Sequence, residues 1–264
     1  MSRLIPLTSA EIHLWLAFYD AIAEERVRFS YRELLGEAER EQELRFYSAK
    51  DRLRYLTTRA LVRTVLSRYV SIHPREWVFS TNAYGRPGIV NAPARDACLS
   101  LSISHTDSLI VLGLSKRRAI GVDVENFLVR EVSMDIAERF FAPEEVAALR
   151  AVPPCRQQYR FFEYWTFKEA YVKARGMGLS LPFDKIAFHY PGDQGVEVTI
   201  DPALADDSAR WQFWQFQPRS QYLVAVCAEC AEGPSPNLVL RQAIPMLEEE
   251  EVAVEVLRSS KRIN

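Results

Sequence analysis

Hydrophobic residues recur along this chain with the period of a helix in several segments. Those of residues 45–69 fall on one helix face, namely Leu53, Leu56, Ala60, Leu61 and Val65. This spacing predicts a long helix with one buried side. Residues 9–30 show similar spacing after Ser9, so we expect a first helix there. Further helices are expected over 133–150 and, after a break at two prolines, around 165–175.

Other segments alternate with the period of a strand. Residues 98–104 place leucines and an isoleucine on one face and Ser100, Ser102 and Ser104 on the other. We expect His105 to follow in a tight turn before a buried strand over 109–114. Residues 119–125 alternate again, with Gly121, Asp123 and Glu125 on the polar face. Strands are also expected over 184–190, 195–200, 211–217 and 221–228, in a sheet packed on the helix around 165–175.

The order of these elements divides the chain. A long helix followed by strands over 45–114 precedes a second group of helices and strands over 133–228. This rhythm indicates two related lobes, although no repeat is visible residue by residue. We place the N-terminal lobe at 1–118, the C-terminal lobe at 119–230 and an extension without a readable role at 231–264.

Composition narrows the class of protein. The chain has 264 residues, a net charge of −2 and four cysteines. No overall positive field favours nucleic acid, and the cysteines are too few and scattered for a disulfide framework. No apolar run is long enough for a membrane span, and acidic residues interrupt the N-terminal apolar residues where a signal peptide would lie. A cytoplasmic location is the expectation.

Several polar residues are candidates for a functional site, but each of them taken alone also has a structural interpretation. On the helix, Glu169 and Lys173 stand one turn apart and form either a solvated ion pair or part of a site. On the strand, Asp123 and Glu125 either line an exposed edge or hold a hard divalent cation such as Mg²⁺. His105 is either a structural residue or a cation in a polar pocket.

Two further features also allow both a structural and a functional interpretation. Arg86, between a glycine and a proline in a loop over 81–88, is either incidental or grips an anion. The basic helix face formed by Arg52, Arg59 and Arg63 either aids solubility or anchors phosphates. Taken together, acids, a lysine, a Ser-His pair and this Arg describe a site for a polyphosphate bound to Mg²⁺. No P-loop, dinucleotide fingerprint or nucleophile elbow is present.

Four motifs in order carry a resemblance to a known family. They are GVDVE at 121–125, WTFKEAYVKARGMGLSLPF at 165–183, STNAYGRPGI at 80–89 and LSISHT at 101–106. With them the chain resembles the Sfp-type 4′-phosphopantetheinyl transferases over roughly residues 40–230. The resemblance implies an α+β pseudo-dimer of two similar α/β lobes with the active site in the cleft between them. It implies a monomer that moves 4′-phosphopantetheine from coenzyme A to a serine of an apo carrier protein, releasing adenosine 3′,5′-bisphosphate.

The resemblance also implies roles for individual residues. Asp123, Glu125 and Glu169 would ligate Mg²⁺, and Glu169 would accept the proton of the carrier serine. Lys173 and His105 would bind phosphates and act in catalysis. Further contacts to coenzyme A would come from Ser104, from Arg86, and from Lys50 or a neighbouring arginine near the 3′-phosphate.

The sequence departs from the family in two places. Relatives often carry lysines just before the stretch that corresponds to residues 45–47, where this chain is acidic, and Arg86 replaces a usual lysine. Arg52, Arg54 or Arg59 are candidates to compensate. Two rival functions are a non-catalytic coenzyme A or carrier-protein binding module and a nucleic-acid binder. Retention of all three acids and Lys173 argues against the first, and the acidic balance argues against the second. The motifs do not indicate which carrier protein is served.

Overall fold

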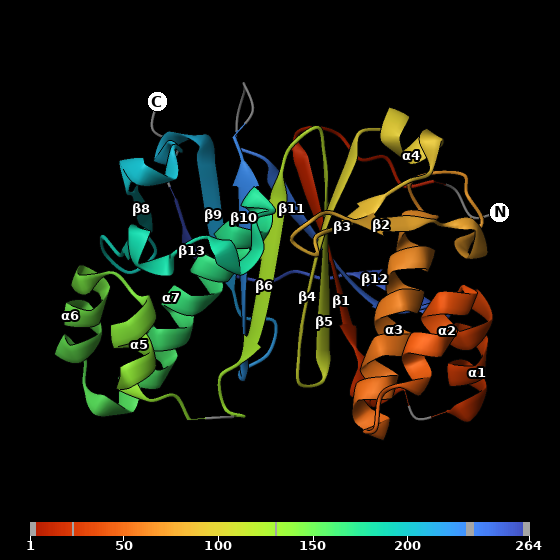
Figure 1. Cartoon of the computed structure of the whole chain (residues 1–264), viewed down its shortest axis with the longest axis horizontal. Coiled ribbons are helices and arrows are strands. Elements are labelled where there is room, and N and C mark those ends of the chain that lie inside the picture. Colours follow the sequence, from red (N-terminus) through yellow and green to blue (C-terminus); the bar gives the residue numbers. More distant parts are fainter. Residues whose placement is uncertain (1–3, 23, 130, 231–234, 261–264) are drawn as a thin grey trace. The chain divides into compact units, whose positions relative to one another are not determined.

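The computed structural model describes residues 4–22, 24–129, 131–230 and 235–260 (Figure 1). The chain forms two compact units. Unit 1 runs to Asn82 and includes Pro87–Arg117 and Pro236–Ala253, while unit 2 contains Ala83–Arg86, Arg118–Ser235 and the stretch from Val254. Among the described residues, no helix combines the length and the hydrophobicity that crossing a membrane requires.

Unit 1 is a five-stranded sheet with helices packed on one face. Its strand order is β12-β11-β1-β5-β4. The strands are β1 (Glu11–Phe18), β4 (Leu99–Thr106), β5 (Leu109–Lys116), β11 (Asn237–Ile244) and β12 (Glu248–Glu251). The helices are α1 (Glu25–Leu34), α2 (Glu37–Leu44), α3 (Ala49–Leu66) and the short α4 (Ala92–Asp96), and a hairpin joins β2 (Phe79–Thr81) to β3 (Pro87–Ile89). The core lies where Trp15, Ile110 and Leu112 meet the apolar face of α3.

The expected helix over 9–30 is wrong in its first half, because residues 11–18 form β1. This strand lies in the middle of its sheet, parallel to β11 and antiparallel to β5. Seven of its eight residues are buried, so both faces carry apolar side chains and the alternation typical of a strand is absent. A continuous apolar run does not distinguish a buried strand from a buried helix. The helical part of the prediction survives only as α1.

Unit 2 packs a long helix on a four-stranded sheet. The strand order is β13-β9-β10-β6, with β6 (Ile120–Asn126), β9 (Trp211–Phe216), β10 (Tyr222–Glu229) and β13 (Val256–Ser259). The helices are α5 (Met134–Phe140), α6 (Pro143–Ala151) and α7 (Pro154–Arg175). The core is rich in aromatic rings: Phe167 of α7 stacks on Phe188 and meets Phe213 of β9 edge-on.

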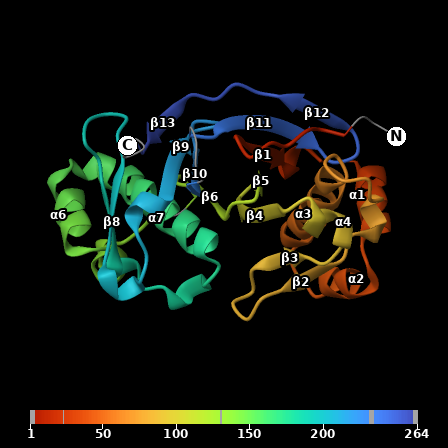
Figure 2. The ribbon, with the colours of Figure 1, turned by 90° about the horizontal axis from the view of Figure 1, so that it is seen from above.

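Two expectations about strands need revision. The strands expected over 184–190 and 195–200 exist as β7 (Ile186–His189) and β8 (Glu197–Ile200), but they pair only with each other, in a separate two-stranded sheet. The extension over 231–264 supplies β11, β12 and β13, which Figure 2 shows beside β1 and β9. It therefore completes the sheets of both units.

An ion pair without any exposure fixes the middle of α7. The Lys168 ammonium lies 2.7 Å from the Glu145 carboxylate, and both side chains are 0 % exposed. The ammonium also donates to the Phe183 and Ile186 carbonyl oxygens, while Glu145 accepts from the backbone N–H groups of Phe188 and Ala142. Burial lowers the pKa of Lys168 and raises that of Glu145, but the hydrogen bonds surrounding each group hold the pair in its charged form.

We expect single substitutions of this pair to be costly. Lys168→Met leaves a buried carboxylate without its counter-charge and should lower the free energy of unfolding by about 3–5 kcal/mol. The double variant Lys168→Met/Glu145→Gln should lose less than the sum of the single losses, because it removes both charges. Urea unfolding of wild type, Lys168→Met, Glu145→Gln and the double variant measures the coupling between the two residues. Strictly additive losses would contradict this prediction.

Candidate active site

The backbone of α7 lies directly against β6. A Cβ atom added to Gly121 would lie 1.9 Å from the Ala170 carbonyl oxygen and 2.4 Å from the Ala174 backbone nitrogen. Only glycine permits this close approach of the helix backbone to the strand. Side chains alternate along a strand, so Asp123 and Glu125 share the Gly121 face of β6, which faces α7.

Asp123 and Lys173 meet across this contact. The Lys173 ammonium, on the last turns of α7, lies 2.7 Å from the Asp123 Oδ1 atom. The Asp123 side chain is 6 % exposed and that of Lys173 is 29 % exposed, so the ion pair opens to solvent only on the lysine side. The structure thus joins two residues that the sequence placed on different elements.

Glu169 lies one turn before Lys173 and shares its environment. The pKa of Glu169 is raised to about 7, mainly by burial and in part by the negative charge of Asp123, while the charge of Lys173 opposes the rise. Two carboxylates therefore compete for one ammonium in a half-buried place. Such a group of charges favours a second cation.

The donor chemistry of this place fits Mg²⁺, which prefers carboxylate oxygens. Asp123 and Glu169 interact strongly with each other, and Glu125 is half-buried two residues beyond Asp123. Among the described residues, however, no group of three or more His, Cys, Asp or Glu side chains is arranged to hold a metal ion. The Lys173 ammonium supplies the positive charge beside Asp123 in this structure.

The remaining candidates of unit 1 lie around the hairpin of β4 and β5. Ser104 is buried and pairs with Val111, whereas His105 is exposed and pairs with Ile110. His105 therefore belongs to β4, not to the turn expected from the sequence. The turn comes two residues later, where Ser108 has a φ of 65°. Lys50, at the start of α3, forms an ion pair with Asp107 of this turn.

Arg86 lies at the junction of β6 and α7, with which Ala83–Arg86 cluster in unit 2. Its guanidinium donates to the Ala174 carbonyl oxygen over 2.9 Å and to the Ile120 carbonyl oxygen over 3.2 Å. Burial lowers the pKa of this guanidinium. The side chain is thus engaged by the backbone at the end of α7 and at the start of β6.

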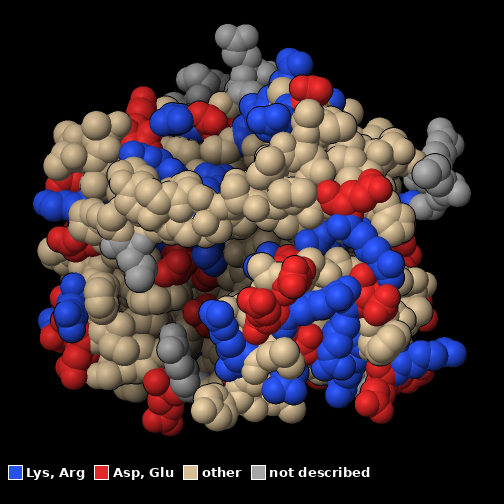
Figure 3. Space-filling model, turned by 45° about the vertical axis from the view of Figure 1, so that its right-hand side comes forward, with Lys and Arg blue, Asp and Glu red and all other residues tan. Residues whose placement is uncertain are grey.

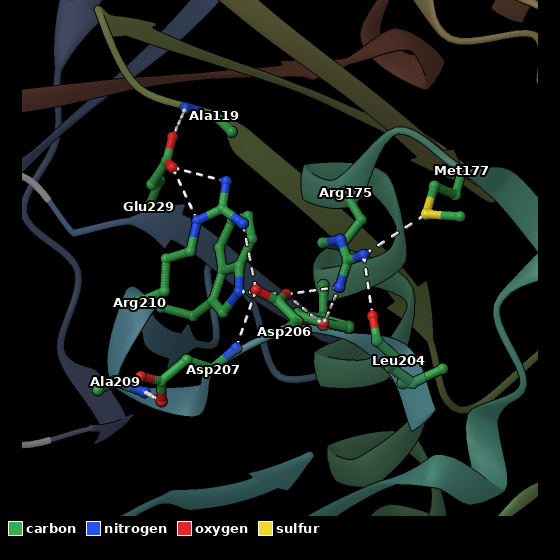
Figure 4. A network of polar contacts seen from close by, with 11 residues as sticks. Ala119, Arg175, Met177, Leu204, Asp206, Asp207, Ala209, Arg210 and Glu229 are labelled. Carbon is green, nitrogen blue, oxygen red and sulfur yellow. Dashed lines mark hydrogen bonds and ion pairs between the residues drawn. The ribbon is translucent and has the colours of Figure 1, made fainter. Parts of the chain in front are cut away.

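Sequence reasoning missed the residue that holds the other side of α7, Asp206 (Figure 4). Its carboxylate, 1 % exposed, accepts hydrogen bonds from Tyr171 over 2.7 Å, from Arg175 over 2.6 Å and from the Trp211 indole over 2.7 Å. Burial opposes ionisation of Asp206, but these partners together lower its pKa. No sequence signal identifies it, since it lies in a polar loop next to a second aspartate.

The basic face of α3 is largely compensated by acids. Arg63 and Arg59 both pair with Glu39 of α2, at 2.6 Å and 3.5 Å, and Arg54 pairs with Asp51. On the face turned forward in Figure 3, positive and negative side chains alternate and do not form a field of one sign. These contacts favour a structural role for the basic face.

The protein has an α+β fold with a half-buried carboxylate–ammonium centre between a strand and a helix. Comparisons with known proteins identify its family. The 4′-phosphopantetheinyl transferase superfamily model matches residues 119–227, and the N-terminal model of a 4′-phosphopantetheinyl transferase matches residues 25–116. The 4′-phosphopantetheinyl transferase Sfp of Bacillus subtilis is 32% identical over 213 residues, 80% of this chain and 88% of Sfp.

A second relative has similar coverage. The 4′-phosphopantetheinyl transferase HetI of Nostoc sp. is 28% identical over 225 residues, 84% of this chain and 89% of HetI. The chain therefore belongs to the Sfp-type 4′-phosphopantetheinyl transferases, as its four motifs led us to expect.

Gly121 should tolerate no side chain. We expect Gly121→Ala to lower the free energy of unfolding by about 3 kcal/mol, because the new Cβ meets backbone atoms that cannot rotate away. Gly88→Ala is the matched control, since its Cβ would meet only the Ser80 hydroxyl, at 3.2 Å. Thermal unfolding of both variants measures the difference, and equal losses would contradict the close contact of β6 with α7.

Glu169 should destabilise the metal-free protein at neutral and higher pH. The folded protein holds the Glu169 proton more tightly than the unfolded chain does, because the pKa rises from 4.5 to about 7. The free energy of unfolding therefore falls as pH rises through this range. With EDTA at pH 8, Glu169→Gln should be more stable than wild type by on the order of 2 kcal/mol, and at pH 4 the two should be alike. A variant less stable than wild type at pH 8 would refute this account.

Proposed function

We propose that the protein transfers the 4′-phosphopantetheine group of coenzyme A to a serine hydroxyl of an apo carrier protein, with Mg²⁺, and releases adenosine 3′,5′-bisphosphate. The observation that carries the proposal is the meeting of Asp123, Glu169 and Lys173 where β6 touches α7. The family supports the reaction type, and the charges supply what the reaction needs.

Asp123 and Glu169, with Glu125, are the residues that would hold the metal. Mg²⁺ would supply positive charge to the pyrophosphate oxygens and lower the repulsion felt by an incoming nucleophile. The raised pKa of Glu169 supports this assignment, because burial and the charge of Asp123 both disfavour the ionised carboxylate, and a bound cation would oppose both effects.

Lys173 is suited to hold phosphate oxygens. Its ammonium is partly exposed and is oriented by Asp123 at 2.7 Å, so the side chain is already ordered before a substrate arrives. Phosphoryl-type transfer depends mainly on positioning and on neutralising negative charge. Lys173 therefore stabilises the charge that moves to the leaving adenosine 3′,5′-bisphosphate.

Glu169 is suited to accept a proton. A carboxylate within reach of the attacking hydroxyl can act as a general base, directly or through a water molecule. The carrier serine oxygen forms a bond to the β-phosphorus of coenzyme A, the bond from that phosphorus to the bridging oxygen breaks, and the serine proton passes to Glu169. No covalent bond to the enzyme is needed.

Unit 1 carries further candidates for contacts to coenzyme A. His105 is exposed at the end of β4 and is a candidate for a phosphate, and Ser104 next to it is a candidate hydrogen-bond donor. Lys50 pairs with Asp107, so a phosphate that binds Lys50 must compete with this carboxylate. These assignments follow the family motifs and stand as proposals.

Transfer is tested by mass spectrometry of the carrier. Purified protein with Mg²⁺, coenzyme A and a panel of apo carriers should add a phosphopantetheine-sized mass to one carrier serine, and EDTA should abolish the gain. Asp123→Ala and Glu169→Gln should lower kcat/KM at least about 100-fold while remaining folded. Glu138→Ala, which breaks only an exposed pair with Arg150, is the control that keeps activity.

Two outcomes would overturn the proposal in different ways. Coenzyme A binding without transfer to any carrier would favour the non-catalytic binding module. An active Asp123→Ala variant would refute the assignment of Asp123 to the metal.

A further inference from the structure

The end of α7 and the start of β6 are joined by one side chain. Arg86 lies in the short segment Ala83–Arg86 and reaches two carbonyl oxygens, that of Ala174 on α7 and that of Ile120 on β6. Both acceptors are close in sequence to residues of the proposed site. Ala174 follows Lys173, and Ile120 lies three positions before Asp123.

The proposed reaction requires that these two elements keep one relative position. Asp123 is carried by β6, whereas Glu169 and Lys173 are carried by α7, so a shift of one element changes the distances between the charges. The Asp206 carboxylate holds Tyr171 and Arg175 to the loop before β9. Through Arg210 and Glu229 the same network reaches the backbone N–H of Ala119, just before β6 (Figure 4). Arg86 donates to one carbonyl oxygen at the end of α7 and to one at the start of β6, in addition to the Lys173–Asp123 ion pair farther along the same two elements.

We propose that Arg86 is a positioning residue, which fixes α7 against β6 through these two carbonyl oxygens, and that its guanidinium does not serve as a coenzyme A phosphate ligand. The helix C-terminus carries partial negative charge, which a cation stabilises. Two donors of one rigid guanidinium can satisfy two carbonyl oxygens at once, whereas a lysine in its place concentrates its charge at one point.

Gly176 packs closely against the Arg86 side chain. It ends α7 with a φ of 67°, and a Cβ atom there would lie 2.9 Å from Arg86 Nη1 and 3.0 Å from Arg86 Cδ. A glycine is needed at this position both for the left-handed backbone and for the close packing of Arg86. Gly176→Ala therefore displaces Arg86 without removing it.

The inference rests on the proposed function, and its experiment separates the two. We would compare Arg86→Met, Arg86→Lys, Gly176→Ala and the double variant Arg86→Met/Gly176→Ala with wild type. Arg150→Met, which removes an exposed ion pair of α6 with Glu138, is the matched control. The measurements are kcat, the KM for coenzyme A, the Mg²⁺ concentration for half-maximal activity, and amide hydrogen exchange of β6 and of the last turn of α7.

A positioning role predicts a specific pattern. Arg86→Met should lower kcat and raise the Mg²⁺ requirement about 10-fold each, as loss of a group that orients metal ligands does, while the KM for coenzyme A changes less than about twofold. Arg86→Lys should change the same quantities in the same direction, because it keeps the charge and loses the fork. The double variant should lose less kcat than the product of the two single losses, because part of the effect of Gly176→Ala acts through Arg86.

A phosphate ligand predicts a different pattern. Arg86→Met would then raise the KM for coenzyme A about 10-fold or more, and Arg86→Lys would behave like wild type; either result overturns the inference. If wild type transfers nothing to any carrier, the proposed function fails by itself. Hydrogen exchange still decides on Arg86 in that case: faster exchange of the α7 end and of β6 in Arg86→Met supports the inference, and unchanged exchange refutes it.

Discussion

The contact between the α7 backbone and β6 at Gly121 is the constraint on which the site depends. A strand normally keeps a helix at the distance set by side chains of both elements. Here the strand has no side chain at the point of contact, and the helix opposes it with Ala170 and Ala174. This close contact brings side chains of the two elements within hydrogen-bond distance of each other. The Lys173 ammonium, for example, lies 2.7 Å from the Asp123 carboxylate.

This proximity places like charges together, and the surrounding fold has to hold them there. Glu169 and Asp123 repel each other, which is one cause of the raised pKa of Glu169. The opposing forces come from buried ion pairs along α7. Lys168 binds Glu145 of α6, Arg175 binds Asp206, and Glu163 accepts from Arg258 of β13 at 2.8 Å. A helix held at several points can carry a site that is unfavourable by itself until a cation arrives.

The sequence predicted most of the charged centre, because its spacing rules are local. The alternation of β6 put Asp123 and Glu125 on the Gly121 face, and the helical period put Glu169 one turn from Lys173. It failed for β1, whose apolar residues face both sides of a sheet, and for residues 237–259, whose pairing with β1 and β9 is distant in sequence. The contacts of Arg86 and Asp206 were equally out of reach, because their partners are set by tertiary packing and have no local signal.

The C-terminal strands show how a sheet edge is protected from pairing with other chains. Without β11 and β12, β1 would present one unpaired edge, which invites pairing with other chains. The new edge is β12, whose four residues are all exposed glutamates, and charged side chains on an edge strand oppose pairing with other chains. Arg68 of the segment after α3 anchors it by a bidentate contact with Glu249, at 2.6 Å and 3.0 Å. An acidic run can thus be structural when it lies at the edge of a sheet, where hydrophobic patterning gives no signal.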